Sequence, residues 1–142
     1  MSALEDKDAI RELLAEYCFL LDSQRLQEFG KLFTEAGLWA SRNGRATGPA
    51  AIESLLRKIV SESAPELRRK HFTANIVIRL NGDSAEVISN FLVVRDSAAG
   101  PAIAVAGTYR DVVARQGAKW LFRSRELSHD IAAGSGAKPG AR

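Results

Sequence analysis

The hydrophobic period of this chain changes once, near residue 68, and the change limits the folds that the sequence can adopt. Before it, apolar residues recur every three or four positions, as they do in amphipathic helices. After it, apolar and polar residues alternate, as they do in strands with one buried face. Helices first and strands last predict an α+β domain in which N-terminal helices pack on a curved, mainly antiparallel sheet.

Three helices are predicted in the first half of the chain. The first covers residues 6–22, where the apolar residues form one stripe, and a shorter one follows at about 24–33. The third begins near Pro49, because proline suits the first turn of a helix, and it ends before Pro65.

Four strands are predicted in the second half, at about 68–80, 84–96, 102–115 and 119–130. The short links between them favour antiparallel neighbours. A further short strand is expected around Leu38 and Trp39, before a turn at Asn43 and Gly44.

Length and composition favour one domain. The chain has 142 residues, of which 46% are hydrophobic and 26% charged, and these are ordinary values for a globular protein with a core of its own. We expect the domain to cover residues 1–131 and the small, basic segment 132–142 to be a flexible tail.

Composition also limits the cellular compartments and the classes of partner that we expect. Cys18 is the only cysteine, which excludes an internal disulfide and a thiolate metal site and suits a reducing cytoplasm. No segment has the length of a membrane span or the order of a secretory signal, so we expect a cytoplasmic protein without a membrane partner. The net charge of +3 comes from scattered basic residues, which argues against a nucleic-acid partner.

An aspartate and a histidine stand out against this scaffold. Asp22 continues the apolar stripe of the first helix, and a carboxylate that points into a fold needs a partner. His71, one of only two histidines, is the candidate partner. An aspartate that holds one imidazole nitrogen leaves the other free as a general base and stabilises the imidazolium. The two residues therefore form a candidate catalytic dyad.

Each candidate also has a purely structural interpretation. Asp22 lies at a helix junction, where an aspartate often caps the next helix. Simple alternation along residues 68–80 puts the apolar side chains under the helices and His71 toward water. Only a bulge, or another subunit over the second face, would bury both faces of this strand. Tyr17 fits a core position and Arg125 fits a structural ion pair.

Five segments, which span almost all of the chain before the tail, resemble one known family. They are "AIRELLAEYCFLLDSQRLQEFGKLFTEAGLW", "GPAAIESLL", "HFTANIVI", "AGTYRDVVAR" and "KWLFRSRELSHD". Their order resembles the cone-shaped nuclear-transport-factor-2-like (NTF2-like, cystatin-like) fold, and their motifs resemble its SnoaL-like branch. Within this branch the chain looks most like scytalone dehydratase, bacterial bile-acid 7α-dehydratase and hexachlorocyclohexane dehydrochlorinase.

The resemblance implies roles for four residues. Asp22, at the end of the first helix, and His71, at the start of the first long strand, correspond to the catalytic dyad of this group. Tyr17 lies near the tyrosine of the dehydratases, where the dehydrochlorinase has a lysine, and this difference favours loss of water over loss of halide. Arg125 corresponds to the arginine that assists the leaving group in the dehydrochlorinase.

The resemblance also implies a function. It implies a cofactor-free lyase of the dehydratase type, or an isomerase, that acts on a small, apolar, cyclic substrate in a hydrophobic pocket. No metal is expected, because the sequence has no recognisable spacing of metal ligands. Trp39, Asn75 and Asn90 are expected to bind the substrate. A homo-oligomer is expected as well, either a dimer or a trimer. Two other functions stay open because one fold hosts many functions: the non-catalytic β subunit of a ring-hydroxylating oxygenase, and a ligand-binding domain.

Overall fold

The computed structural model describes residues 2–132, so nearly all of the expected tail, 132–142, lies outside the described residues. Within this range the helices are α1 (Ala3–Asp22), α2 (Leu26–Gly30) and α3 (Pro49–Glu62). The strands are β1 (Phe33–Ser41), β2 (Gly44–Thr47), β3 (Arg69–Asn81), β4 (Ser84–Arg95), β5 (Ala102–Gln116) and β6 (Lys119–Ala132). None of these described helices is long and apolar enough to cross a lipid bilayer.

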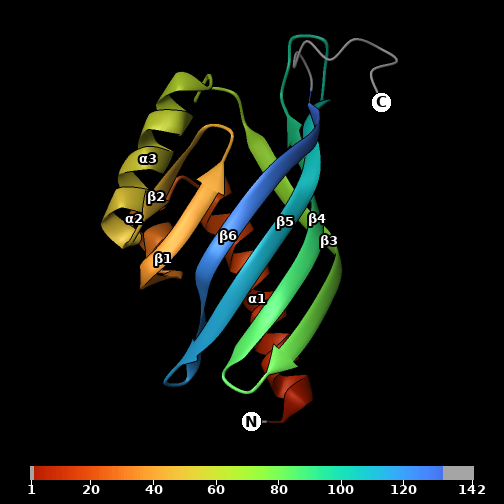
Figure 1. The fold of residues 1–142 in the computed structure, drawn as a ribbon. Coiled ribbons are helices and arrows are strands. Elements are labelled where there is room, and N and C mark those ends of the chain that lie inside the picture. The colour runs from red at the N-terminus through yellow and green to blue at the C-terminus, as the bar shows by residue number, and fades with distance from the viewer. Residues whose placement is uncertain (1, 133–142) are drawn as a thin grey trace.

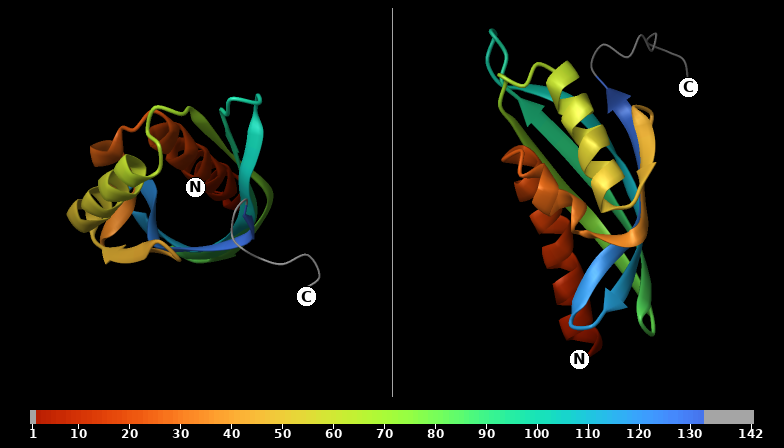
Figure 2. Two further views of the ribbon diagram at one scale, coloured as in Figure 1. Left: turned by 90° about the horizontal axis from the view of Figure 1, so that it is seen from above. Right: turned by 90° about the vertical axis from the view of Figure 1, so that its left-hand side faces the viewer.

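The strands form one sheet in the order β2-β1-β6-β5-β4-β3. Strands β3 to β6 follow one another as an antiparallel meander, whereas β1 runs antiparallel to β2 and parallel to β6. The sheet is strongly curved, and α1 lies along its concave side (Figures 1 and 2). The predicted architecture, with N-terminal helices on a curved and mainly antiparallel sheet, is confirmed.

Two helix boundaries differ from the prediction for local reasons. Helix α1 begins at Ala3 because Ser2 and Glu5 form a capping box: the Ser2 hydroxyl accepts from the Glu5 backbone N–H, and the Glu5 carboxylate accepts from the Ser2 N–H. Helix α2 ends at Gly30, so Phe33 opens β1 instead of ending a helix.

A β-bulge in β3 changes which residues of this strand point inward. The register between β3 and β4 shifts between Ala74 and Val77, and Asn75 has a left-handed backbone with a φ of 55°. Before the bulge the side chain of His71 points toward the helices and is 15% exposed; after it, Ile78 does so and is 7% exposed. Simple alternation, which put His71 toward water, is therefore wrong for this strand, because the extra residue brings His71 and the later apolar residues to the same face.

Side chains from the three helices and from the concave face of the sheet form one hydrophobic core. Aromatic pairs connect its parts: Tyr17 of α1 packs against Phe29 and edge-on against Tyr109, and Phe33 packs against Phe122. Such pairs contribute about 0.5–1.5 kcal/mol each beyond their buried area. This packing fixes α1 on the sheet and so places its last residue beside β3.

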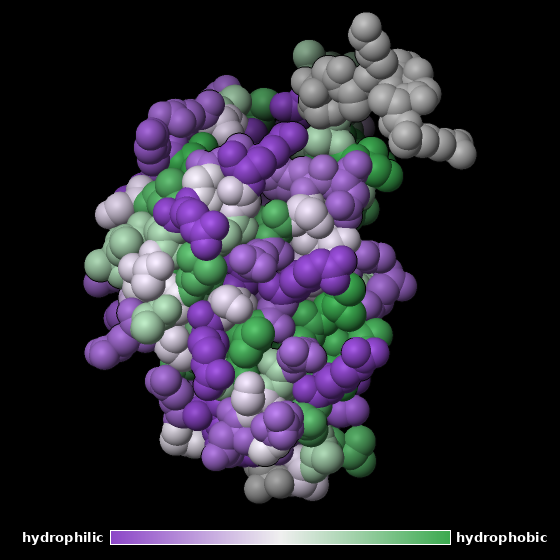
Figure 3. Space-filling model, in the orientation of Figure 1, coloured by the Kyte–Doolittle hydropathy of each residue, from purple (hydrophilic) through white to green (hydrophobic). Residues whose placement is uncertain are grey.

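The convex face of the sheet carries charged and apolar side chains side by side (Figure 3). A shallow hollow of about 400 Å³ on this face includes two cross-strand pairs of opposite charge, Arg79 with Glu86 and Arg110 with Glu126. Val77 and Ile88 face each other across β3 and β4 in the same hollow and are 50% and 40% exposed. Adjacent exposed apolar side chains of this kind are typical of contact surfaces.

Candidate functional site

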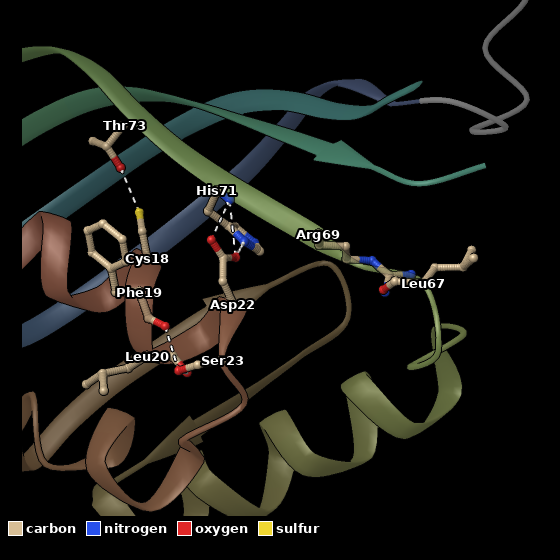
Figure 4. A network of polar contacts seen from close by, with 9 residues as sticks. All are labelled: Cys18, Phe19, Leu20, Asp22, Ser23, Leu67, Arg69, His71 and Thr73. Carbon is tan, nitrogen blue, oxygen red and sulfur yellow. Dashed lines mark hydrogen bonds and ion pairs between the residues drawn. The ribbon is translucent and has the colours of Figure 1, made fainter. Parts of the chain in front are cut away.

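Asp22 and His71 contact each other where the end of α1 meets the start of β3 (Figure 4). The Asp22 Oδ1 atom lies 2.5 Å from His71 Nδ1. The backbone N–H of His71 also donates to both carboxylate oxygens, at 3.0 and 3.2 Å. One carboxylate thus holds the ring and the backbone of the same residue, which fixes the orientation of the imidazole and leaves its Nε2 outside the contact.

A second polar contact joins α1 to β3 one helical turn earlier. Cys18 Sγ lies 3.3 Å from Thr73 Oγ1, and Figure 4 shows this contact beside the Asp22–His71 pair. Burial raises the pKa of the Cys18 thiol, so the thiol stays protonated at neutral pH. We therefore interpret Cys18 as part of the contact between helix and strand and not as a nucleophile.

Two pockets border the Asp22–His71 pair, and both residues line each of them. The larger pocket, which we call the dyad pocket, has about 660 Å³ and opens where α1 ends, with β3, β4 and the end of α3 around it. Its walls combine apolar side chains with cations, among them Val60, Leu67, Phe72, Pro101, Arg69, Lys70 and Arg95. The smaller pocket has about 240 Å³ and lies between α1 and β3. Small-molecule sites usually have about 300–1,000 Å³, which makes the dyad pocket the candidate substrate site.

Tyr17, Trp39 and Arg125 lie together in the core and line neither of these pockets. The Trp39 Nε1–H donates to the Tyr17 hydroxyl at 3.0 Å, and the Arg125 guanidinium carbon lies 4.2 Å from the centre of the Tyr17 ring. Burial raises the pKa of Tyr17, so its hydroxyl stays protonated. The structure thus brings these three predicted site residues together as a buried cluster, separate from the Asp22–His71 pair.

Arg125 is fully buried, and Asp111 neutralises its charge. Its Nε and Nη2 atoms each donate to one carboxylate oxygen of Asp111 at 2.8 Å. Burial alone would lower the pKa of Arg125, but attraction to Asp111 outweighs this effect and raises it. The geometry agrees with the ion-pair interpretation of Arg125. The sequence does not single out Asp111, because only the register of β5 and β6 makes the two residues neighbours.

Asn75 and Asn90 lie on the convex face of the sheet, away from the dyad pocket. Both residues are exposed, and the Asn90 side-chain amide donates to the Asn75 side-chain carbonyl at 3.2 Å. His71 points to the concave side. This placement disagrees with the expected role of the two asparagines in substrate binding, because the sheet itself stands between them and the pocket.

The second histidine, His129, is partly buried on β6 and lines neither pocket at the dyad. Its ring lies edge-on to Phe91, with 6.1 Å between ring centres, and burial lowers its pKa. We interpret His129 as a structural residue. Among residues 2–132, no three histidine, cysteine, aspartate or glutamate side chains gather into a group that could hold a metal ion.

Arg95 is a pocket residue that the sequence analysis missed. It lies opposite Arg69 in the register of β3 and β4, and both line the dyad pocket. The alternation of β4 was the available signal, since it puts Arg95 on the same inward face as the buried Val93. Alternation alone, however, gives only the face of Arg95. The register between β3 and β4 is also required to predict that its side chain lies near His71.

Comparison with known proteins identifies the family. The model of the SnoaL-like domain matches residues 2–126, whereas no protein with a curated description matches the chain. Among solved structures, an NTF2-like protein with a cystatin-like fold from Novosphingobium aromaticivorans is 28% identical, with a TM-score of 0.78 over 92% of this chain and 86% of that chain. A function-unknown protein from Mycobacterium tuberculosis is 26% identical, with a TM-score of 0.79 over 94% of this chain and 79% of that one.

A third solved structure, the β subunit of a putative aromatic-ring-hydroxylating dioxygenase from Novosphingobium aromaticivorans, shares the fold. It is 21% identical, with a TM-score of 0.77 over 91% of this chain and 92% of the subunit. The fold is therefore NTF2-like, as the sequence predicted, and the family match covers most of the chain. We conclude that the chain belongs to the SnoaL-like domain family.

Proposed function

We propose that the chain is a cofactor-free lyase of the dehydratase type, or an isomerase, whose reaction begins with the removal of a proton from carbon. The observation that carries this proposal is the 2.5 Å contact between Asp22 and His71 beside a pocket of about 660 Å³. A general base needs an oriented imidazole next to space for a substrate, and this site offers both. The apolar part of the pocket wall favours a small substrate with an apolar, cyclic body.

His71 supplies Nε2 as the base, because Nδ1 is held by Asp22. Nε2 takes the proton, and the electron pair of the broken C–H bond forms a new C=C bond. The C–O bond to the leaving hydroxyl breaks, and the hydroxyl departs as water after the imidazolium returns the proton. Asp22 stabilises the imidazolium between the two transfers. If the proton returns to a different carbon and no C–O bond breaks, the same residues catalyse an isomerisation.

Tyr17 and Arg125 support this chemistry from the core in our proposal. The leaving-group role that the resemblance implies for Arg125, like a direct catalytic role for Tyr17, requires contact with the substrate, but both residues are fully buried and line neither pocket. Tyr17 belongs to α1 and Arg125 to β6, and the tyrosine ring lies on the guanidinium. We therefore assign them to positioning α1, whose last residue is Asp22.

Proton abstraction can be tested without knowing the natural substrate. We would incubate the protein in D₂O with a panel of cyclic ketones, with and without a β-hydroxyl group, and follow the loss of α-hydrogen signals and the appearance of alkenes by NMR. The wild-type chain should exchange or dehydrate at least one member of the panel. His71→Ala should slow this reaction by roughly 100-fold or more, since a positioned general base contributes about 10²- to 10⁴-fold.

His129→Ala is the matched control, because the second histidine lies outside the dyad pocket. It should leave the exchange rate close to the wild-type value, because His129 lines neither pocket at the dyad. A folded His71→Ala protein that keeps the wild-type rate would overturn the proposal.

The β subunit of a ring-hydroxylating oxygenase is the second candidate, and the structural likeness to such a subunit favours it. In that case Asp22 and His71 satisfy each other as structural residues. Purification of the tagged chain from its own host would then yield a complex with a large iron-containing subunit. A chain that is free of such a subunit and active in the exchange assay would exclude this candidate.

We further propose that the chain forms a homo-oligomer through the convex face of the sheet. The exposed pair Val77 and Ile88 lies there between arginines and glutamates. A patch that carries both signs of charge is able to complement a second copy of itself, because each arginine can meet a glutamate of the partner.

A further inference from the structure

We propose that the ligand of the dyad pocket carries a carboxylate group and that Arg95 binds it. This inference rests on the proposed function for the location of the site and adds the chemical class of the ligand. The observations that carry it are the cations of the pocket wall, the partners that each of them has, and the position of Arg95 relative to His71.

Arg95 lies directly opposite another arginine. The register of β3 and β4 pairs Arg69 with Arg95, two positions along each strand from the pair His71 and Val93. Like charges directly opposite each other on neighbouring strands repel, and a negatively charged group beside them would relieve this repulsion. Within residues 2–132, neither arginine forms an ion pair with an acidic side chain.

Arg69 satisfies its donors with backbone carbonyls. Its Nη1 donates to the carbonyls of Ala64 and Leu67 at 3.1 Å each, and its Nη2 donates to the carbonyl of Ser63. Figure 4 shows its side chain directed away from the Asp22–His71 pair, toward Leu67. Arg69 is therefore occupied in holding the segment after α3.

Arg95 has no such partners among residues 2–132. Its Nε atom is buried, and no acceptor within the described residues bonds it. Arg68 is paired with Asp96 at 2.8 Å, so that nearby carboxylate is already engaged. A buried donor without an acceptor is uncommon in folded proteins, and a bound ion is one explanation for it.

The charge of the pocket wall agrees with an anion. The wall carries four cationic side chains, Arg68, Arg69, Lys70 and Arg95, and two carboxylates, Asp22 and Asp96. The carboxylates are engaged by His71 and Arg68, so neither of them neutralises Arg95. An arginine binds a carboxylate with two parallel hydrogen bonds, so Arg95 is the group that recognises the ligand's planar anion.

The position of Arg95 also suits the proposed chemistry. Arg95 and His71 point to the same concave side from neighbouring strands and line the same pocket. A ligand whose carboxylate lies on Arg95 would therefore have its apolar body next to the imidazole. A fixed anchor beside the base orients the carbon from which the proton is removed.

Binding of matched acids and amides tests this inference. We would titrate the full-length protein with benzoate and 2-naphthoate and, separately, with benzamide and 2-naphthamide, by isothermal calorimetry. Each amide has the shape of its acid but lacks the charge. At least one acid should bind roughly 10- to 100-fold more tightly than its amide, because a hydrogen bond to a charged group is much stronger than one between neutral groups.

Variants assign the preference to Arg95. Arg95→Gln should reduce the difference between acid and amide to less than about threefold, while the affinity for the amide stays unchanged. Arg95→Lys, which keeps the charge and is a second check if the glutamine variant folds poorly, should retain part of the preference. Arg123→Gln is the matched control, since Arg123 is exposed on β6 and outside the dyad pocket.

Three results would overturn the inference: equal affinity of acid and amide, binding by none of the four compounds, or an undiminished preference for the acid in Arg95→Gln. These titrations involve no turnover, so their failure is separate from that of the proposed function. If the protein is active but does not prefer carboxylates, only the carboxylate inference is wrong. If the protein prefers carboxylates but has no proton-abstraction activity, only the proposed lyase function is wrong.

Discussion

At the scale of single residues, Asp22 joins local structure to chemistry. Its carboxylate accepts the backbone N–H of His71 at 3.0 and 3.2 Å and contacts the ring at 2.5 Å. The first interaction fixes the start of β3 against the end of α1, and the second orients the imidazole. One residue thus has both a structural and a proposed catalytic role, and different substitutions can separate the two.

Two substitutions at position 22 should differ in their effect on stability. Asp22→Ala removes the acceptor of the His71 N–H, and an unsatisfied polar group of this kind costs about 1–3 kcal/mol. Asp22→Asn keeps an oxygen for that N–H and should cost clearly less. Urea denaturation measures both values, with Asp8→Ala on the exposed side of the same helix as control. Equal losses at position 22 would show that the backbone bond contributes little.

Breaking the buried ion pair between Arg125 and Asp111 should destabilise the protein more than the substitutions at position 22. Arg125→Met leaves the Asp111 charge buried without a partner, since both side chains are 0% exposed, and such a change costs about 3–5 kcal/mol. The double variant Arg125→Met, Asp111→Leu removes both charges and should recover most of this loss. Chemical denaturation of the two variants is the measurement. A double variant as unstable as the single one would mean that packing around the guanidinium, and not its charge, stabilises the core.

At the scale of elements, the bulge in β3 decides whether the site exists. The chain needs His71 and the later apolar residues on one face, but strict alternation would put them on opposite faces. Asn75 adopts a φ of 55°, and the register with β4 shifts between Ala74 and Val77. Asparagine tolerates this left-handed backbone better than other residues apart from glycine.

Substitutions at position 75 should therefore follow backbone preference and not side-chain chemistry. Asn75→Gly should change the stability little, because glycine adopts a positive φ without strain. Asn75→Val should cost about 1–2 kcal/mol, the penalty of a left-handed backbone for an ordinary residue. Thermal unfolding measures the difference. If valine is tolerated as well as glycine, the bulge is not a constraint on the strand.

Asp6 joins the first turn of α1 to β5 and β6 at the opposite end of the molecule. Its carboxylate accepts from Arg115 Nη2 at 2.8 Å and from Trp120 Nε1 at 3.0 Å. Burial alone would raise the pKa of Asp6, but the hydrogen bonds from Arg115 and Trp120 outweigh it, so the pKa lies below the ordinary value of 3.8. The folded state therefore favours the ionised carboxylate.

The pH dependence of this contact has a definite sign. The pKa of Asp6 is lower in the folded than in the unfolded chain. Its contribution to the stability of the fold is therefore complete above the pKa of the unfolded chain, and it is lost as the pH falls through the pKa of the folded chain. Asp6→Asn should thus destabilise the protein at pH 7, and the cost should shrink below about pH 4. The urea midpoints of the wild-type chain and of Asp6→Asn, measured at pH 7 and below about pH 4, test this, with Asp8→Asn as control. A cost that does not change with pH would assign the effect to packing.

At the scale of the whole molecule, the sequence predicts the architecture better than it predicts the site. The order of helices and strands follows from the change of period near residue 68, and the meander follows from short turns, so both are local properties. The pairs Asp111–Arg125 and Arg69–Arg95 depend on strand register, which is set by bulges and by the complete fold. For the same reason Asn75 and Asn90 were expected at the pocket, although they lie on the convex face.

Assembly is a property of the whole molecule, and the convex face allows a sharp test. Ile88 is 40% exposed and lies opposite both Val77 on β3 and Arg110 on β5. If two copies meet on this face, Ile88→Glu introduces a buried charge into the contact, which is strongly unfavourable. Light scattering coupled to gel filtration should show a dimer for the wild-type chain and a monomer for Ile88→Glu.

A control and a salt series complete this test. Leu4→Glu changes an apolar side chain that is 80% exposed on α1, far from the sheet's convex face, and should leave the molar mass unchanged. Because arginine–glutamate pairs across the contact are partly screened by salt, dissociation should become easier as the ionic strength rises, unless the apolar pair dominates. A wild-type chain that is monomeric at every concentration and ionic strength would exclude assembly through this face, and the exposed Val77 and Ile88 would then be ordinary surface residues.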